Sequence, residues 1–241
     1  MNHPQHGTTF GDEGAGGSGG GSAGDAGYAA RHRALTGWGA AATALILLTL
    51  LYDVLLTVGD WRVYLAVEHY LAGTVTEEEI QSADDFSAFF TAWKGAALIV
   101  AAGLVFLAWL WRARLNAEAL GGARSQRRAR GWTVGAWMVP VANLWIPYQV
   151  VTDVWKASAP RRANPGPVLA LWWGCWLIGG MVGRAYTYQV MQETLSEDGL
   201  RRAVYLGTVS TALDVLAGVL VIHVVHRIGG WQTRRAAAAP R

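Results

Sequence analysis

Four stretches of apolar residues, each long enough to cross a lipid bilayer as a helix, constrain this chain more than any other feature. They cover residues 38–58, 86–111, 167–186 and 203–225. About 20 helical residues rising about 1.5 Å each match a hydrocarbon core of about 30 Å. Hydrophobic residues make up 52% of the 241-residue chain and charged residues 15%, a balance that argues against an ordinary soluble domain. The sequence therefore predicts an all-α polytopic membrane protein with four transmembrane helices within residues 31–228.

A fifth apolar stretch, Gly131–Ser158, is interrupted by Pro140 and Pro147 and is not predicted to cross the membrane. Proline removes a backbone donor and clashes with the preceding helical turn. The piece before Pro140 is about two turns, or roughly 10 Å, which is too short to span. Pro147 suits the first turn of a second helix, and Asn143 can satisfy backbone groups that the break leaves unpaired. We expect a proline-broken segment that is either re-entrant or lies flat along the interface.

Basic residues predict the orientation of the chain through the positive-inside rule. Arginines precede the first span, flank the broken segment and follow the fourth span, whereas the connection 59–90 is rich in aspartate and glutamate. The sequence therefore places both termini in the cytoplasm, the connection 59–90 outside, and the protein in a bacterial inner (plasma) membrane as a multi-pass protein. A fifth full crossing by residues 131–158 would carry the basic C-terminus to the outer side.

The segments outside the spans are expected to differ in order. Residues 1–30 are rich in glycine and serine and have no apolar period, so we expect a disordered cytoplasmic tail. Residues 229–241 are expected to form a short basic cytoplasmic tail. In the outer connection, Trp61–Leu71 can form an amphipathic helix, and Thr76 with Glu79 has the spacing of a capping box.

No residue pattern indicates catalysis, a cofactor or a metal site. Cys175 is the single cysteine, which excludes an intramolecular disulfide and a cysteine-based metal site. The chain has no His-Glu-x-x-His, no Gly-x-Ser-x-Gly and no phosphate-binding loop. The arginines cluster at the span ends and build no separate basic domain, so nucleic-acid binding is not expected. We therefore expect a non-enzymatic protein without cofactors.

Charged residues inside the predicted spans are the candidate functional groups, because a charge in a bilayer is expensive. They are Asp53, Arg184 and Asp214. Counted along the helices, Arg184 lies about 6 Å below the outer interface, Asp53 about 9 Å and Asp214 about 16 Å. Depth therefore predicts an ion pair between Asp53 and Arg184. The two aspartates could instead belong to a proton or ion pathway, and a polar clasp that fixes helix packing is the preferred interpretation.

The proline-broken segment also carries a family resemblance. Its core reads Trp-x-Val-Pro-x-Ala-Asn-Leu-Trp-x-Pro-Tyr-Gln, and the sequence LNAEAL precedes it. The residues that we single out are Trp132, Pro140, Asn143, Trp145, Pro147, Tyr148 and Gln149. With these motifs the chain resembles a bacterial membrane family, domain of unknown function 4328, over roughly Gly37–Arg227. The resemblance implies the architecture and no activity.

Two functions from different classes fit the sequence. The first is a membrane-embedded interaction or structural module, surrounded by the lipid bilayer, that binds a membrane or cytoplasmic protein partner through its arginine-rich inner surface. The alternative is a small transporter or channel that uses Asp53 and Asp214. Tryptophans of the broken segment are interpreted as interface anchors in preference to the walls of a site for a lipid or small apolar molecule. The oligomeric state is open.

Overall fold

A computed structural model describes residues 32–74, 76–79, 81–82, 85, 92–160, 164, 166–191 and 196–238. The helices described in full are α2 (Thr36–Leu71), α4 (Ala92–Gly121), α5 (Trp132–Met138), α6 (Ile146–Ser158), α7 (Gly166–Val190) and α8 (Glu197–Ala238), with the short 3-10 turns η1 (Ala123–Ser125) and η2 (Ala142–Leu144). Four of them, α2, α4, α7 and α8, are long and apolar enough to cross a membrane, which confirms the predicted four-span architecture. The tail 1–30 and residues 86–91 of the second predicted span lie outside the described residues.

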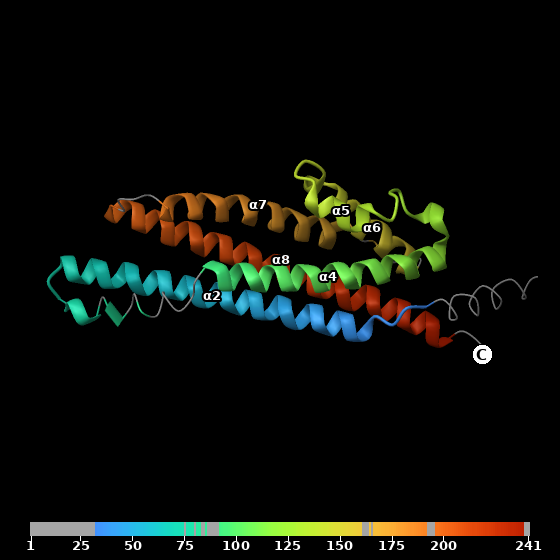
Figure 1. The fold of residues 1–241 in the computed structure, drawn as a ribbon, viewed down its shortest axis with the longest axis horizontal. Helices are drawn as coiled ribbons and strands as arrows, with labels where there is room; N and C mark the ends of the chain where they lie inside the picture. Colours follow the sequence, from blue (N-terminus) through green and yellow to red (C-terminus); the bar gives the residue numbers. More distant parts are fainter. Residues whose placement is uncertain are drawn as a thin grey trace, which may run out of the picture.

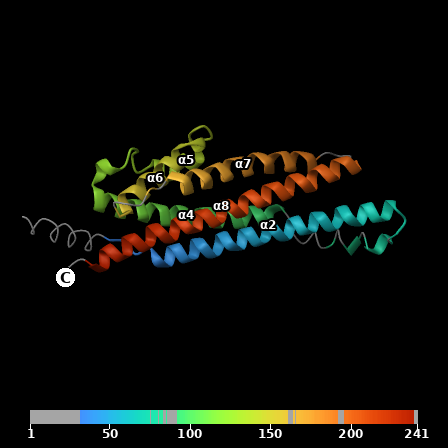
Figure 2. The same cartoon turned by 180° about the vertical axis from the view of Figure 1, so that it is seen from behind.

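The four long helices run alongside one another and form an elongated bundle (Figure 1). The most extensive pairing is that of α7 with α8, and α2 packs against both α8 and α4. The shorter helices α5 and α6 gather at one end of the bundle, where α2 begins and α8 ends (Figures 1 and 2). Residues 122–131, which connect α4 to α5, lie at this end and carry four arginines. We call it the arginine-rich end.

Helix α2 is longer than the predicted span, because it continues without a break through Leu71. The amphipathic helix expected over Trp61–Leu71 is therefore the last part of α2 and not a separate element. Two contacts hold this extension on neighbouring helices. The indole Nε1 of Trp61 donates to Oγ1 of Thr208 in α8 at 2.9 Å, and Tyr186 of α7 donates to Asp60 at 2.7 Å. The connection to α4 thus starts at residue 72 and not at residue 59.

Helix α8 also exceeds its prediction, at the opposite end. It continues past the apolar stretch to Ala238, so residues 229–238 are helical where a short tail was expected. Ile228, Trp231 and Gln232 are buried, and Trp231 lies edge-to-face with Trp155 of α6 at a centroid distance of 4.8 Å. Packing against α6 therefore keeps this polar-flanked stretch in the helix, because burial of large side chains outweighs a weak local preference.

The broken segment has the form that its prolines predict. Pro140 follows the end of α5, and Pro147 lies in the first turn of α6. Helix α6 turns its valines and Trp155 into the core and leaves Lys156 exposed, but Asp153, which the helical period places on the face of Lys156, is buried as well. The turn between α5 and α6 contacts a spanning helix, because Nε1 of Trp173 in α7 donates to the carbonyl oxygen of Leu144 at 2.8 Å. A continuous helix over residues 131–158 is therefore excluded.

Small residues bring α7 and α8 together, as the Gly-x-x-x-Gly spacing of Gly179 and Gly183 predicts. A Cβ on Gly179 would lie 2.9 Å from Oδ1 of Asp214, and one on Gly183 would lie 3.1 Å from Oγ of Ser210. Ser210 also donates to the carbonyl oxygen of Gly179 at 3.2 Å. A side chain at Gly179 would have to displace Asp214 and Leu213 of α8, and one at Gly183 would have to displace Ser210.

The capping box expected before the second span forms in part. The backbone N–H of Thr76 donates to Oε2 of Glu79 at 3.4 Å, and the backbone N–H of Glu79 donates to the carbonyl oxygen of Thr76 at 3.2 Å. At the far end of α4, Gly122 has a φ of 75°, a left-handed conformation that suits glycine and ends the helix where the Gly-Gly pair predicts.

Candidate functional site

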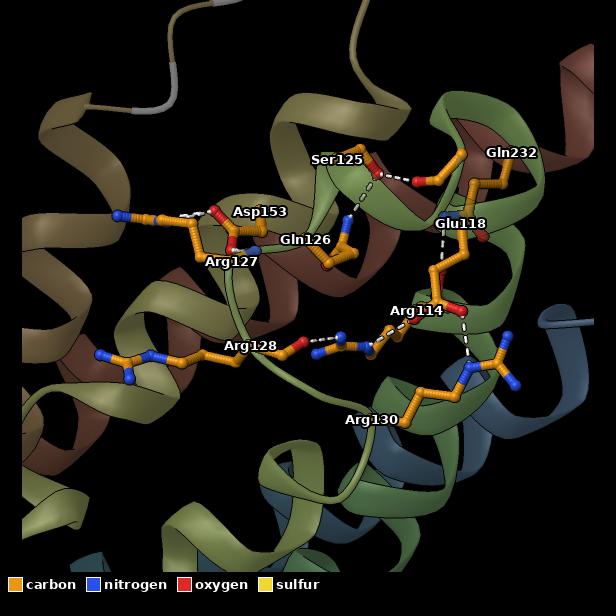
Figure 3. Close-up of polar contacts among 11 residues, drawn as sticks. Arg114, Glu118, Ser125, Gln126, Arg127, Arg128, Arg130, Asp153 and Gln232 are labelled. Atoms are coloured by element: carbon orange, nitrogen blue, oxygen red, sulfur yellow. Dashed lines mark hydrogen bonds and ion pairs between the residues drawn. The ribbon is translucent and has the colours of Figure 1, made fainter.

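The connection between α4 and α5 is held on α4 by Glu118, whose carboxylate binds two arginines. Its Oε1 lies 3.1 Å from Nε of Arg114, and its Oε2 lies 2.7 Å from Nε of Arg130. The side chain of Arg114 is only 2% exposed, and its guanidinium also donates to the carbonyl oxygen of Arg128 (Figure 3). A buried guanidinium needs a counter-charge and acceptors for its N–H groups. Glu118 supplies that charge.

Helix α6 holds the same connection through Asp153, which is 5% exposed. Its carboxylate accepts hydrogen bonds from the backbone N–H of Arg127 at 3.0 Å and from Nε of Arg127 at 2.8 Å. One turn earlier, Oε1 of Gln149 accepts a hydrogen bond from Nε of Arg128 at 3.1 Å. The motif residue Gln149 and its neighbour Asp153 therefore fix the arginine-bearing connection against α6. Figure 3 shows the contact of Asp153 with Arg127.

A second, uncharged set of contacts joins α4, α6 and α8, and we call it the amide network. Its members Asn116, Ser158 and Gln232 are each 0% exposed. Nδ2 of Asn116 donates to Oε1 of Gln232 at 3.0 Å, and Nε2 of Gln232 donates to Oγ of Ser158 at 2.7 Å and to the carbonyl oxygen of Ala113 at 2.9 Å. Asn116 also bonds the backbone N–H and C=O of Arg33, before α2. The network thus ties the arginine-rich end together.

Most other motif residues of the broken segment either start or end its short helices or pack against the core. Trp132 begins α5, and both Trp132 and Tyr148 pack against the core. Pro147 is buried, whereas Pro140 and Trp145 are exposed. These residues define where the short helices start and stop, and they contribute surface that is available for contact with lipid or protein.

The expected role of Asn143 is not observed. Its backbone N–H donates to the carbonyl oxygen of Val139 at 2.8 Å, which continues the turn across Pro140. Its side-chain Oδ1, however, is buried without a hydrogen-bond partner in the part of the chain that the structure describes. The backbone, and not the amide side chain, therefore satisfies the break at this position.

Residues of α2 and α8 face each other along a line that we call the α2–α8 seam. Trp61 contacts Thr208, Thr57 contacts Thr211, and Leu50 packs beside Gly218. Asp53 and Asp214, one from each helix, line one cavity. The hydroxyl oxygens of Thr57 and Thr211 are 2.7 Å apart. Polar side chains of the first and fourth spans therefore face each other within the bundle.

The seam borders a cavity of about 350 Å³ between α2, α4, α7 and α8, with α5 at one side. Asp53 and Asp214 both line it, and aromatic rings make up much of its wall. The rings are those of Phe106, Trp137, Trp172 and Trp176. Trp137 lies edge-to-face with Trp176 at 5.8 Å and with Phe106 at 5.8 Å, so they form one continuous wall. A ring of the broken segment therefore lines a cavity, which the interpretation of its tryptophans as interface anchors missed.

The predicted ion pair between Asp53 and Arg184 is wrong. Arg184 is exposed, and its Nη1 donates to the carbonyl oxygen of Gly180, one turn back on its own helix, at 3.0 Å. The four ion pairs found among the described residues include neither Asp53 nor Asp214. Oγ of Ser210, one turn back on α8, donates to Oδ2 of Asp214 at 3.4 Å. Asp53 and Asp214 instead line the same cavity, and the clasp that depth predicts does not form.

Three polar residues that hold the arginine-rich end were not singled out from the sequence. Arg114 and Glu118 are four residues apart in α4, a spacing that brings them onto one helix face, but nothing in the pattern indicates their burial. Gln232 lies in what was taken for a tail. In the described ranges no group of three or more His, Cys, Asp or Glu side chains could hold a metal ion.

The long apolar helices and the short helices folded back at one end define a multi-pass membrane protein of the four-helix type. The model of a protein family, described as domain of unknown function (DUF4328), matches residues 72–230. The chain belongs to this family. The matched region starts later than the expected Gly37 and contains the broken segment, the arginine-bearing connection and most of the amide network. Searches of curated proteins and of solved structures found no match.

Proposed function

We propose that the protein is a non-enzymatic, membrane-embedded interaction module that presents its broken segment to a membrane protein partner. The observation that carries this proposal is the exposed apolar tip between α5 and α6. Its exposed residues are Met138, Val139, Val141, Leu144 and Trp145. Large apolar side chains gathered on one protruding element are typical of surfaces that bind lipid or protein.

The contacts beneath the tip support a fixed presentation. Glu118 and Asp153 hold the connection that leads into α5, and Trp173 of α7 holds the carbonyl oxygen of Leu144. A surface that is ordered before binding loses less conformational entropy when a partner docks. The basic residues support an orientation with the arginine-rich end in the cytoplasm and a re-entrant tip that reaches into the bilayer from that side.

A photoreactive residue at Val141 tests this function, because that side chain is 64% exposed at the centre of the tip. In native membranes we expect one protein adduct of defined mass after irradiation. Val219, an exposed residue in the middle of α8, is the matched control and should give lipid adducts alone. If Val141 also gives lipid adducts alone, the tip is only a lipid anchor and the interaction module is rejected.

A second candidate function, proton or ion transport, is favoured by the α2–α8 seam. Polar groups follow one another along it from Asp60 and Tyr186 through Thr57 and Thr211 to the two carboxylates of the cavity. Ionisable residues inside a bundle are typical of ion and proton pathways. Beyond the cavity, towards the arginine-rich end, Oγ1 of Thr43 lies 3.4 Å from Nε2 of His226, which would continue such a path.

Proton flux into vesicles separates the two functions. If the seam conducts, vesicles with the purified protein should acidify faster than empty vesicles in a proton gradient. The substitution Asp214→Asn should return the rate to that of empty vesicles, because it removes an ionisable group midway along the path. An acidification rate for the wild-type protein equal to that of empty vesicles contradicts a proton pathway.

A further inference from the structure

We infer that the cavity beside the α2–α8 seam is a binding site for an organic cation with an apolar body. This inference concerns a site distinct from the exposed tip of the broken segment, and it does not depend on the interaction module. It also does not require that the cation crosses the membrane. Three properties of the cavity carry it: its charge, its wall and its opening.

The charge of the cavity lacks a balancing group on the protein. Asp53 and Asp214 line it together, and in the described ranges no arginine, lysine or histidine forms an ion pair with either. Arg184, the partner that depth predicts, donates to a carbonyl oxygen of its own helix. Two carboxylates set among apolar walls attract a cation more strongly than they would in bulk water, because charges interact more strongly where the dielectric is lower. A cationic group is therefore the ligand chemistry that this pair of acids favours.

The wall of the cavity fits an organic cation better than a metal ion. Beyond the two carboxylates its lining is mainly apolar and aromatic, including Phe106, Trp137 and Trp176. Metal ions such as Ca²⁺ need six or more oxygen ligands, which this lining does not offer. Aromatic faces instead attract quaternary ammonium groups and pack against hydrocarbon. A volume of about 350 Å³ lies within the range of small-molecule sites.

The opening of the cavity explains why the ligand should also be apolar. Ile99 of α4 lines the cavity and is 57% exposed, so it lies at the rim. The neighbouring exposed residues of α4 and α2 are also apolar, among them Val100, Leu104 and Leu51. In a bilayer this surface faces acyl chains. A ligand that enters here passes between apolar side chains and acyl chains, which favours a cation with an apolar body, such as an aromatic ring, over a small hydrated ion.

Calorimetric titration of the purified full-length chain in a maltoside detergent tests the site. The probe is benzyltrimethylammonium, which carries a quaternary ammonium and one ring and is soluble enough to stay out of the micelles. We expect saturable binding to the wild-type protein. Asp53→Asn should weaken binding about tenfold, as expected for loss of one charge-assisted contact, and Asp53→Asn with Asp214→Asn should remove it.

A steric variant keeps the test valid if the aspartate variants do not fold. Gly103 lines the cavity, and a Cβ there would meet nothing within 4 Å, so Gly103→Leu adds volume without a clash at its first atom. It should weaken binding at least about tenfold by filling the space. Gly174→Leu in α7 is the matched control, because its Cβ position is equally open and it does not line the cavity. It should bind like the wild type.

Three results would overturn the inference. The first is no saturable binding of benzyltrimethylammonium by the wild-type chain. The second is equal affinity in the wild type and in the Gly103→Leu variant, which would place the probe elsewhere. The third is equal or tighter binding of neopentylbenzene, the uncharged isostere of the probe, which would mean that the carboxylates contribute nothing. None of these results bears on the crosslinking at Val141, so the two proposals fail independently.

Discussion

Replacing Glu118 with glutamine should lower the free energy of unfolding by about 3–5 kcal/mol, the range found when one member of a buried ion pair is removed. The reason is the burial of Arg114, whose side chain is 2% exposed. Glutamine keeps the shape of Glu118 and can still accept a hydrogen bond, but it leaves the guanidinium without a counter-charge. Equilibrium unfolding of the protein in detergent, followed by tryptophan fluorescence, measures the loss.

An exposed ion pair and a double variant serve as controls for the role of the buried charge. Asp198→Asn removes an acid from the ion pair with Arg201, in which both side chains are more than half exposed, and should change stability by less than about 1 kcal/mol. The double variant Glu118→Gln with Arg114→Met should be more stable than Glu118→Gln alone, because it removes the unpaired charge. Equal losses for Glu118→Gln and Asp198→Asn would mean that water reaches Arg114 and that the burial argument fails.

The four spans and the broken segment could be predicted because each rests on local chemistry. Long apolar runs are sufficient to identify membrane helices, and Pro140 and Pro147 act on the backbone beside them. The ends of α2 and α8 could not be predicted in this way. They depend on contacts between segments far apart in the sequence, such as Trp61 with Thr208 and Trp155 with Trp231.

The charges inside the bundle show a second limit of sequence reasoning. The depth of Asp53 below the outer interface is counted from residue 59, where the apolar stretch ends and the helix is assumed to leave the membrane. Helix α2 instead continues to Leu71, so that reference point is not a helix end. Depth also says nothing about direction around a helix axis, and Arg184 is exposed while Asp53 lines the cavity. Thr57, four residues from Asp53 and on the same helix face, contacts Thr211 of α8, so this face and not the depth identifies the inner side of α2.

The amide network also depends on contacts between distant segments, which the local sequence does not show. Asn116 drew attention only as part of the family motif LNAEAL, and its partner Gln232 lies 116 positions away. Nothing local marks a glutamine after the last apolar stretch as buried. The pairing becomes visible only when α8 is extended past its apolar part, which brings Gln232 beside α4 and α6.

The consequence is that Gln232→Leu should lower the free energy of unfolding by about 2–3 kcal/mol, although it makes the chain more apolar. Leucine leaves Oγ of Ser158, Nδ2 of Asn116 and the carbonyl oxygen of Ala113 each with one contact fewer in a site closed to water. An unsatisfied buried polar group costs about 1–3 kcal/mol, and partial satisfaction by remaining partners reduces the sum.

The loss should be localised as well as large, which separates it from general misfolding. Because Gln232 links α8 to α4 and α6 by hydrogen bonds, hydrogen exchange should accelerate most in residues 229–238. It should also accelerate at the start of α2, because Asn116, a partner of Gln232, also bonds the backbone of Arg33. Gln189→Leu, the same change in half-buried Gln189 of α7 at the opposite end, should leave both regions protected.

Adding Ser158→Ala to Gln232→Leu should lower the free energy of unfolding by less than the sum of the two single losses, because both changes break the same hydrogen bond. Strict additivity, or exchange that rises evenly along α8, would show that the amide network does not act as a unit.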